Sequence, residues 1–143
     1  MKKTKKIALG IFAGILALPV VLIVLFILFE VIGAAVNHAA GDIQTKKFAG
    51  AVRDEGFEIV STDTFVGNSG NGNHVDLISC VYVRSDCSPE EAAARLSECK
   101  GDVSAGIPDE DDLTDAGLSD GGENLLRLRL FNSAPFSDNI EGH

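Results

Sequence analysis

Basic residues are scarce in this sequence beyond its first six positions. The chain of 143 residues carries 12 Lys and Arg against 21 Asp and Glu, which gives a formal charge of −9. Four of its lysines lie within residues 1–6, so the remainder has eight basic residues against 21 acidic ones, or −13. Such an acidic surface repels phosphate backbones, which excludes nucleic acid as a partner.

The sequence also lacks the spaced motifs that bind phosphate or metal. Its glycine-rich segment does not fit GxGxxG, and no Gly-Lys-Ser/Thr follows it. The histidines His38, His74 and His143 have no ligand-like spacing with one another or with cysteine. The acidic run from Asp109 to Glu123 offers oxygen ligands for Ca²⁺ but lacks the EF-hand spacing, which favours a solvated loop. We therefore expect no cofactor and no metal.

Charge of either sign is missing from residues 7–29. As a helix, these residues would extend roughly 34 Å, slightly more than the hydrocarbon core of a bilayer. Because lipid offers the backbone no hydrogen-bond partners, the segment must be helical, and Pro19 is expected to kink the helix without ending it. The sequence predicts a transmembrane helix over 7–29, preceded by a Lys-rich start over 1–6.

The distribution of lysines predicts the orientation of this span. Four lysines precede it, and none follows until Lys46, so the positive-inside bias places the N-terminus in the cytoplasm and the C-terminal domain outside. A cleaved secretory signal ending near Gly33-Ala34-Ala35 is the alternative, but its apolar region would be far shorter. Since the first cysteine is Cys80, lipoprotein attachment is excluded. We expect a single-pass protein of the cell membrane.

A small-xxx-small pair, Gly10 and Gly14, lies within the predicted span. This spacing lets two helix backbones approach closely and is a candidate contact for a homodimer through the span. Glycine is also frequent in membrane helices in general, which is the simpler interpretation.

The remainder predicts a small α+β domain. Residues 30–45 form a juxtamembrane segment compatible with a continued helix, the domain occupies 46–132, and 133–143 are expected to be a loose tail. Gly56 is placed to end a helix, and Ser88-Pro89-Glu90-Glu91 is a capping box that begins one. The expected elements are a helix over 46–55, strands over 57–66 and 75–84, a helix over 89–100, a connection over 102–122 and a strand over 123–131. They form a three-stranded, mainly antiparallel sheet with both helices on one face.

Alternation within the strands predicts which faces are buried. The odd residues from Val75 to Val83 are expected to face the core. In the last strand, Leu126, Leu128 and Leu130 are expected to be buried, and the alternating Arg127 and Arg129 to face solvent. In the strand over 57–66, Phe57, Ile59 and Phe65 share one parity. Cys80 is thus directed away from the core and Cys99 toward it. With Cys87 well removed from Cys80, no pair of cysteines is placed to form a disulfide.

The loop between the first two predicted strands is the candidate binding site. Gly67-Asn68-Ser69-Gly70-Asn71-Gly72-Asn73-His74 leaves the backbone open and offers neutral donors and acceptors. Loops on a rigid hairpin commonly carry function, so we assign binding to a set of five residues: Asn68, Ser69, Asn71, Asn73 and His74. A plain hairpin turn is the alternative, because a turn needs the same residue types.

Ser69, His74 and Asp76 also suggest a hydrolase. A nucleophile, a base and an orienting carboxylate lie close together in the sequence. A catalytic serine, however, requires a fixed position and an oxyanion hole, and a flexible loop supplies neither. We therefore predict no enzymatic activity and keep the hydrolase as an alternative.

The segment Gly67 to Asp76, behind a Lys-rich start and a single span, resembles uncharacterised small membrane proteins of gut-type Gram-positive bacteria. The resemblance implies a bacterial membrane location and brings no known activity or catalytic residue. The sequence thus predicts a membrane-anchored extracytoplasmic module that binds an unknown ligand or protein partner. An accessory subunit whose span assembles with other membrane helices is a further alternative.

Overall fold

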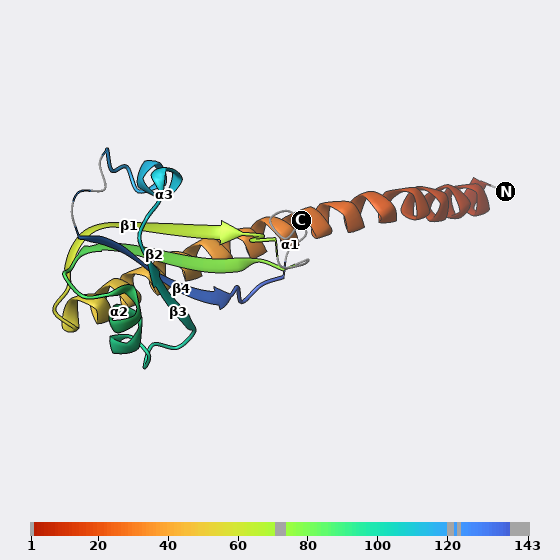
Figure 1. Ribbon diagram of the computed structural model, residues 1–143. Coiled ribbons are helices and arrows are strands. Elements are labelled where there is room, and N and C mark those ends of the chain that lie inside the picture. The colour runs from red at the N-terminus through yellow and green to blue at the C-terminus, as the bar shows by residue number, and fades with distance from the viewer. Residues whose placement is uncertain (1, 71–73, 120–121, 123, 138–143) are drawn as a thin grey trace.

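The computed structural model describes residues 2–70, 74–119, 122 and 124–137, with side chains in the first helix for Phe12 and from residue 14 onward. Its elements are α1 (Lys2–Asp54), β1 (Glu58–Gly67), β2 (Asp76–Arg84), α2 (Pro89–Arg95), β3 (Asp102–Gly106), α3 (Glu110–Asp115) and β4 (Leu125–Ser133). An antiparallel sheet holds four strands in the order β1-β2-β4-β3. In Figure 1, α1 runs beside this sheet and then continues far beyond it toward the N-terminus. The α+β class is confirmed.

A single helix, α1, occupies the residues predicted to form the span, the juxtamembrane segment and the first domain helix. It has 53 residues and continues through Pro19. Its C-terminus is the expected one, because Gly56 adopts a φ of 83° and donates its N–H to the carbonyl of Arg53 at 2.9 Å. The N–H of Phe57 reaches the carbonyl of Val52 at 3.3 Å, which completes a Schellman motif with a buried apolar contact.

The sheet has four strands, so the expectation of three is wrong. The additional strand, β3, lies within the predicted connection over 102–122 and pairs with the outer edge of β4. It has five residues and only two apolar side chains, Val103 and Ala105, which is too short a pattern to stand out from a loop. The same connection contains α3, a helix of six residues capped by Asp109.

One face of the sheet is covered by α1 and α2, as expected for the two predicted helices. Phe48 and Val52 from α1, Leu96 just after α2, and Val81 and Leu128 from the strands lie in one buried cluster. The capping box at Ser88 and Glu91 is formed, although α2 ends at Arg95, before the predicted limit of residue 100. At that end the Arg95 guanidinium lies 4.3 Å above the ring of Phe57, which joins α2 to the end of α1.

The opposite face of the sheet is also buried, so the prediction that this face is exposed to solvent is wrong. Ile78, Cys80 and Tyr82 of β2 lie beneath α3, where Leu113 packs against them. Every residue of β2 except Arg84 is buried, so the central strand is covered on both faces. Cys80 does point away from the α1 side, as predicted, but it lies in this second core and not in solvent.

A β-bulge in β1 explains why the predicted parity of that strand fails. Ile59 pairs with Val83 and Ser61 with Tyr82, so Val60 is an extra residue with no partner of its own. An inserted residue reverses the face of every later side chain in the strand. Phe65 therefore leaves the face that holds Ile59, pairs with Ile78 and is 42% exposed.

Candidate functional site: a groove beside the first helix

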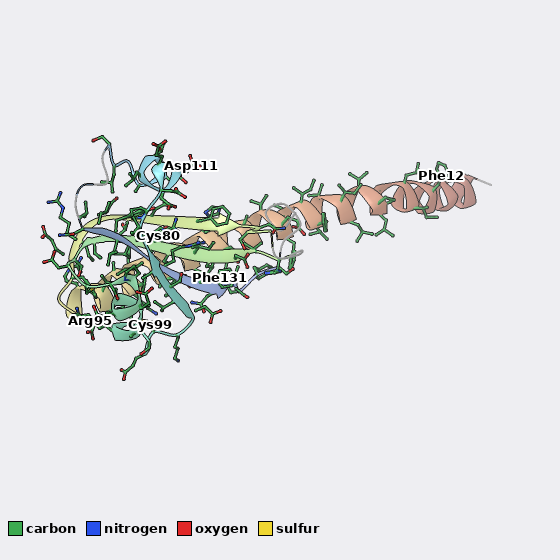
Figure 2. All side chains as sticks on the ribbon, in the orientation of Figure 1. Phe12, Cys80, Arg95, Cys99, Asp111 and Phe131 are labelled. Atoms are coloured by element: carbon green, nitrogen blue, oxygen red, sulfur yellow. The ribbon has the colours of Figure 1, made fainter. Side chains whose placement is uncertain are left out.

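The N-terminal part of α1 carries a long apolar surface that none of the other described helices and strands covers. Its large hydrophobic side chains from Phe12 to Ile32 are each at least half exposed. Figure 2 shows Phe12 on the part of α1 that extends far beyond the sheet. By length and composition α1 could cross a membrane, with a mean hydropathy of 3.1 over its most apolar window. Exposed apolar area of this extent is typical of a segment that lies in lipid or against another protein.

The C-terminal segment docks onto α1 just after this apolar surface. Asn37, fully buried, donates from Nδ2 to the carbonyl of Phe136 at 2.9 Å and accepts from the Phe136 N–H at 3.0 Å. The Phe136 ring lies 5.1 Å from that of Phe29, and a Cβ on Gly33 would come within 2.8 Å of it. The expected loose tail is therefore held in place over 134–137, and residues 138–143 lie outside the described part of the chain.

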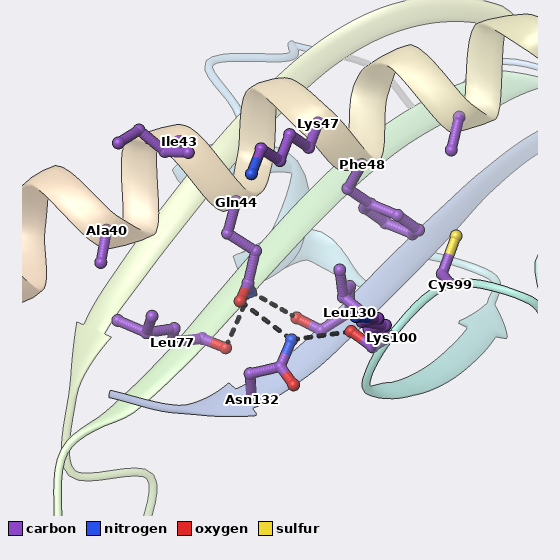
Figure 3. Close-up of a pocket in the computed structure, with 11 residues that line it drawn as sticks. Ala40, Ile43, Gln44, Lys47, Phe48, Leu77, Cys99, Lys100, Leu130 and Asn132 are labelled. Atoms are coloured by element: carbon purple, nitrogen blue, oxygen red, sulfur yellow. Dashed lines mark hydrogen bonds between the residues drawn. The ribbon is translucent and has the colours of Figure 1, made fainter. Parts of the chain in front are cut away.

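Farther along, α1 forms one wall of an apolar groove of about 560 Å³ (Figure 3). The wall consists of side chains at helical spacing, namely Ala40, Ile43, Gln44, Lys47, Phe48 and Ala51. Leu77 of β2, Leu130 and Asn132 of β4, and the loop residues Cys99 and Lys100 complete the lining. The volume lies within the range of small-molecule sites. Eleven helical steps from Ala40 to Ala51 give the groove a length of about 16 Å.

Hydrogen bonds fix the polar part of the groove floor. Gln44 donates from Nε2 to Ser79 Oγ at 3.0 Å, with the carbonyls of Leu77 and Leu130 at 3.2 and 3.3 Å. Its Oε1 accepts from Asn132 Nδ2 at 3.0 Å, and the same nitrogen donates to the carbonyl of Lys100 at 3.1 Å. Because these amides are used within the protein, the floor offers a ligand mainly apolar contact.

The groove carries positive charge in an otherwise acidic domain. Lys47 and Lys100 are the charged members of its described lining. Cys99 lies at the end near Phe48, as Figure 3 shows, and burial followed by the nearby carboxylates of Glu55 and Glu98 raises the pKa of its thiol. This thiol is therefore protonated at neutral pH and is not poised as a nucleophile.

The predicted binding loop is organised by Asp76, a fully buried carboxylate at its base. Asp76 Oδ2 accepts hydrogen bonds from the backbone N–H of Ser69, at 3.2 Å, and from the Ser69 hydroxyl. Its Oδ1 lies 3.0 Å from His74 Nε2. Asn68 Oδ1 accepts from the Gly70 N–H at 2.7 Å, an Asx turn within the loop. Asn71 and Asn73 lie outside the described residues.

This arrangement does not form the catalytic constellation considered from the sequence. A serine nucleophile must give its single hydroxyl hydrogen to the base, and the hydroxyl of Ser69 donates its hydrogen to Asp76 instead. The Asp76 carboxylate thus contacts both Ser69 and His74, and this three-residue contact, the Asp76 clasp, holds the two ends of the hairpin loop together. The geometry gives no support to the hydrolase.

The other sequence candidates have structural surroundings of different kinds. Gly10 and Gly14 both lie within α1, and among the described residues no heavy atom other than the adjacent part of the helix itself would come within 4 Å of a Cβ on Gly14. In the acidic run, Asp112 ion-pairs with Arg127 and its carbonyl accepts from the Tyr82 hydroxyl at 3.0 Å. These contacts hold α3 on the sheet.

Among the described residues, no group of three or more His, Cys, Asp and Glu side chains is arranged to hold a metal.

The groove is not among the sites predicted from the sequence. One usable signal was the spacing of Ala40, Ile43, Lys47 and Ala51, a partly apolar stripe offset from the buried stripe of Phe48 and Val52. A helix with two such stripes has, besides the face that packs in the core, a second partly apolar face that another contact can cover. The residues contributed by β2, β4 and the loop at Lys100 carry no comparable signal, because only the folded sheet brings them together.

Comparisons with protein-family models, with curated proteins and with solved structures gave no match.

Proposed function

We propose that this chain is a single-span membrane protein whose domain lies outside the cytoplasm and binds the acyl chain of an amphiphilic molecule in the groove beside α1. The observation that carries the proposal is the continuity between the apolar surface of α1 and the groove. Ile32, Val36, Ala40 and Ile43 follow one another at spacings of three or four residues, so they lie along one side of the helix. Ile32, Val36 and Ile43 are exposed apolar side chains.

An anchor that stays attached is favoured over a cleaved signal by the packing of Phe136. Cleavage near Gly33-Ala34-Ala35 would remove Phe29 and Gly33 from beneath its ring. The same helix then continues to Asp54 and supplies Phe48 and Val52 to the main core. Lysines at the start of the chain and their absence after residues 7–29 support a cytoplasmic N-terminus.

The dimensions of the groove suit one acyl chain. Half of a hydrocarbon core of about 30 Å is the depth that the chains of one leaflet fill, or about 15 Å. The groove is about 16 Å long, from Ala40 to Ala51. It begins ten residues after Glu30, roughly 15 Å above the end of the predicted span, and the side chains of Ile32 and Val36 bridge part of that height.

Photolabelling would test whether the groove holds an acyl chain. The full chain, in nanodiscs of phosphatidylcholine, would be exposed to a long-chain fatty alcohol that carries a diazirine, and labelled peptides would be mapped by mass spectrometry. We expect adducts on residues 40–51 in addition to those within the span. Ala40→Trp, which fills the groove, should remove these adducts, whereas Ala39→Trp, on an exposed residue outside the groove, should retain them. Adducts confined to the span would contradict the proposal.

A second measurement tests the orientation independently of the groove. Ser97 is exposed on the domain, so Ser97→Cys should react with a membrane-impermeant maleimide in intact cells. Lys3→Cys, within the Lys-rich start, should react only after lysis. Since the native cysteines provide a background, both variants are compared with the unmodified chain. The reverse labelling pattern would place the domain in the cytoplasm.

The small-residue pair Gly10 and Gly14 remains a prediction. The open space beside Gly14 is compatible with a second helix, whether from another copy or from a membrane complex in which this chain is an accessory subunit.

A further inference from the structure

We infer that the molecule bound in the groove is a single-chain anionic amphiphile, a long-chain fatty acid, whose carboxylate lies between Lys47 and Lys100. This inference rests on the proposed acyl-chain site and adds the chemistry of the head group. A neutral head group would leave both ammonium groups without an anionic partner.

The charge of the groove is opposite to that of the domain around it. Lys47 and Lys100 line the groove, whereas the chain beyond its first six residues carries −13. Glu98 and Asp102, which flank Lys100 closely in the sequence, are exposed and do not belong to the lining. Both lysines are exposed, so a carboxylate placed here could form charge-assisted hydrogen bonds with their ammonium groups while its chain lies along the apolar walls.

Two separate elements set the positions of the lysines. Lys47 lies on α1 one turn beyond Ile43, on the groove side of the helix. Lys100 lies in the loop before β3, and Asn132 Nδ2 donates to its carbonyl at 3.1 Å. Gly101 follows with a φ of 129°, and a Cβ at that position would come within 2.7 Å of the Phe131 carbonyl. The loop is thus held tightly against β4, which keeps Lys100 at the groove (Figure 3).

The shape of the groove favours one chain over two. Its path from the apolar surface follows a single row of residues, Ile32, Val36, Ala40 and Ile43, and the strands contribute Leu77, Leu130 and Asn132 opposite α1. A phospholipid bound in the same way would have to leave its second chain in water, which is unfavourable for each exposed methylene.

The test compares matched photoreactive probes, a diazirine fatty acid and the corresponding fatty alcohol, on the full chain in phosphatidylcholine nanodiscs. We expect the acid to label residues 40–51 about tenfold more strongly than the alcohol, a factor typical of one charge-assisted hydrogen bond. Lys47→Met with Lys100→Met retains apolar stems and should remove this preference while leaving alcohol labelling intact. Lys46→Met with Arg53→Met makes the same change in charge at exposed residues outside the groove and should preserve the preference.

Each outcome separates the two proposals. Equal labelling by acid and alcohol, unaffected by the lysine substitutions, would overturn the anionic head group and leave the acyl-chain site standing. Labelling by neither probe at 40–51 would overturn the acyl-chain site itself. Unlabelled phosphatidylglycerol that competes as well as unlabelled fatty acid would overturn the single-chain assignment.

Discussion

Asn37 and Phe136 lie 99 residues apart in the sequence and exchange two hydrogen bonds, one in each direction between the Asn37 amide and the Phe136 backbone. This pair joins the end of the domain to the helix at the point where the exposed apolar surface of α1 gives way to the packed part. The ring of Phe136 covers Gly33 and meets Phe29. The contact closes the base of the domain against the proposed anchor.

Asn37→Ala should release the C-terminal segment. Both Phe136 backbone groups would lose a partner in a partly buried setting, and we expect the free energy of unfolding to fall by about 1–3 kcal/mol. Hydrogen exchange at the Phe136 amide should accelerate accordingly. Asn37→Asp is the matched control, because its carboxylate can still accept from the amide, so it should protect that amide more than alanine does. Unchanged exchange in Asn37→Ala would show that the pair does not hold the segment.

Asp76→Ala should destabilise the β1–β2 hairpin. The substitution removes the acceptor of two Ser69 donors and the close contact with His74 Nε2, which predicts a loss of about 1–3 kcal/mol in unfolding free energy. His74→Gln should cost less, about 1 kcal/mol or below, because the His74 side chain is 42% exposed. Thermal unfolding of the nanodisc-embedded chain would measure both. A larger effect from His74→Gln than from Asp76→Ala would contradict the central role of Asp76 in holding the hairpin loop.

Gln44→Leu should weaken the joint between α1 and the sheet. The variant is similar in size but leaves Ser79 Oγ and Asn132 Nδ2 with one partner fewer each, and we expect a loss of about 1–3 kcal/mol. Asp42→Leu is a suitable control, since Asp42 is an exposed residue on the same helix. Urea unfolding of the two variants would compare the effects, and equal stability would show that Gln44 has no structural role.

Alkaline pH should destabilise the domain through its second core. Burial raises the pKa of the Cys80 thiol above its usual 9.0 and that of the Tyr82 phenol from 10.0 to about 12. Both groups therefore lose their protons at lower pH in the unfolded chain than in the folded one. The unfolding free energy should be constant below pH 9 with respect to these groups and should fall between pH 9 and 12.

Tyr82 provides a direct readout of this effect because it is the only tyrosine in the sequence. Tyrosinate absorbance should develop near pH 12 in the folded protein and near pH 10 after unfolding. Tyr82→Phe should remove the corresponding part of the pH dependence and, by deleting the hydrogen bond to the Asp112 carbonyl, cost about 1 kcal/mol at neutral pH. An ordinary titration near pH 10 in the folded state would contradict the burial argument.

Local sequence signals predicted the elements that depend on nearby residues. The Schellman glycine at Gly56 and the capping box at Ser88 and Glu91 are confirmed, because each is complete within a few residues of chain. The long alternating patterns of β2 and β4 were likewise sufficient to identify these strands. Their pairing with each other required the fold.

Features set by distant contacts could not be predicted in this way. The bulge at Val60 is specified by how β1 meets β2, and nothing in the local pattern shows where the parity changes. Arg127 looked like a solvent-facing residue, but Asp112 neutralises it beneath α3. The groove combines α1, β4 and the loop at Lys100, three segments that share no motif.

Because α1 is continuous from Lys2 to Asp54, a helix and not a flexible linker joins the predicted span to the domain. A domain on a flexible linker explores a volume above the bilayer, whereas this one would stand at a fixed height and turn only with its own helix. Its groove would remain in a layer that begins roughly 15 Å beyond the end of the predicted span as the protein diffuses laterally. Binding in this layer depends on the number of molecules per area of membrane, so the occupancy of the groove should follow the surface density of the amphiphile more closely than its bulk concentration.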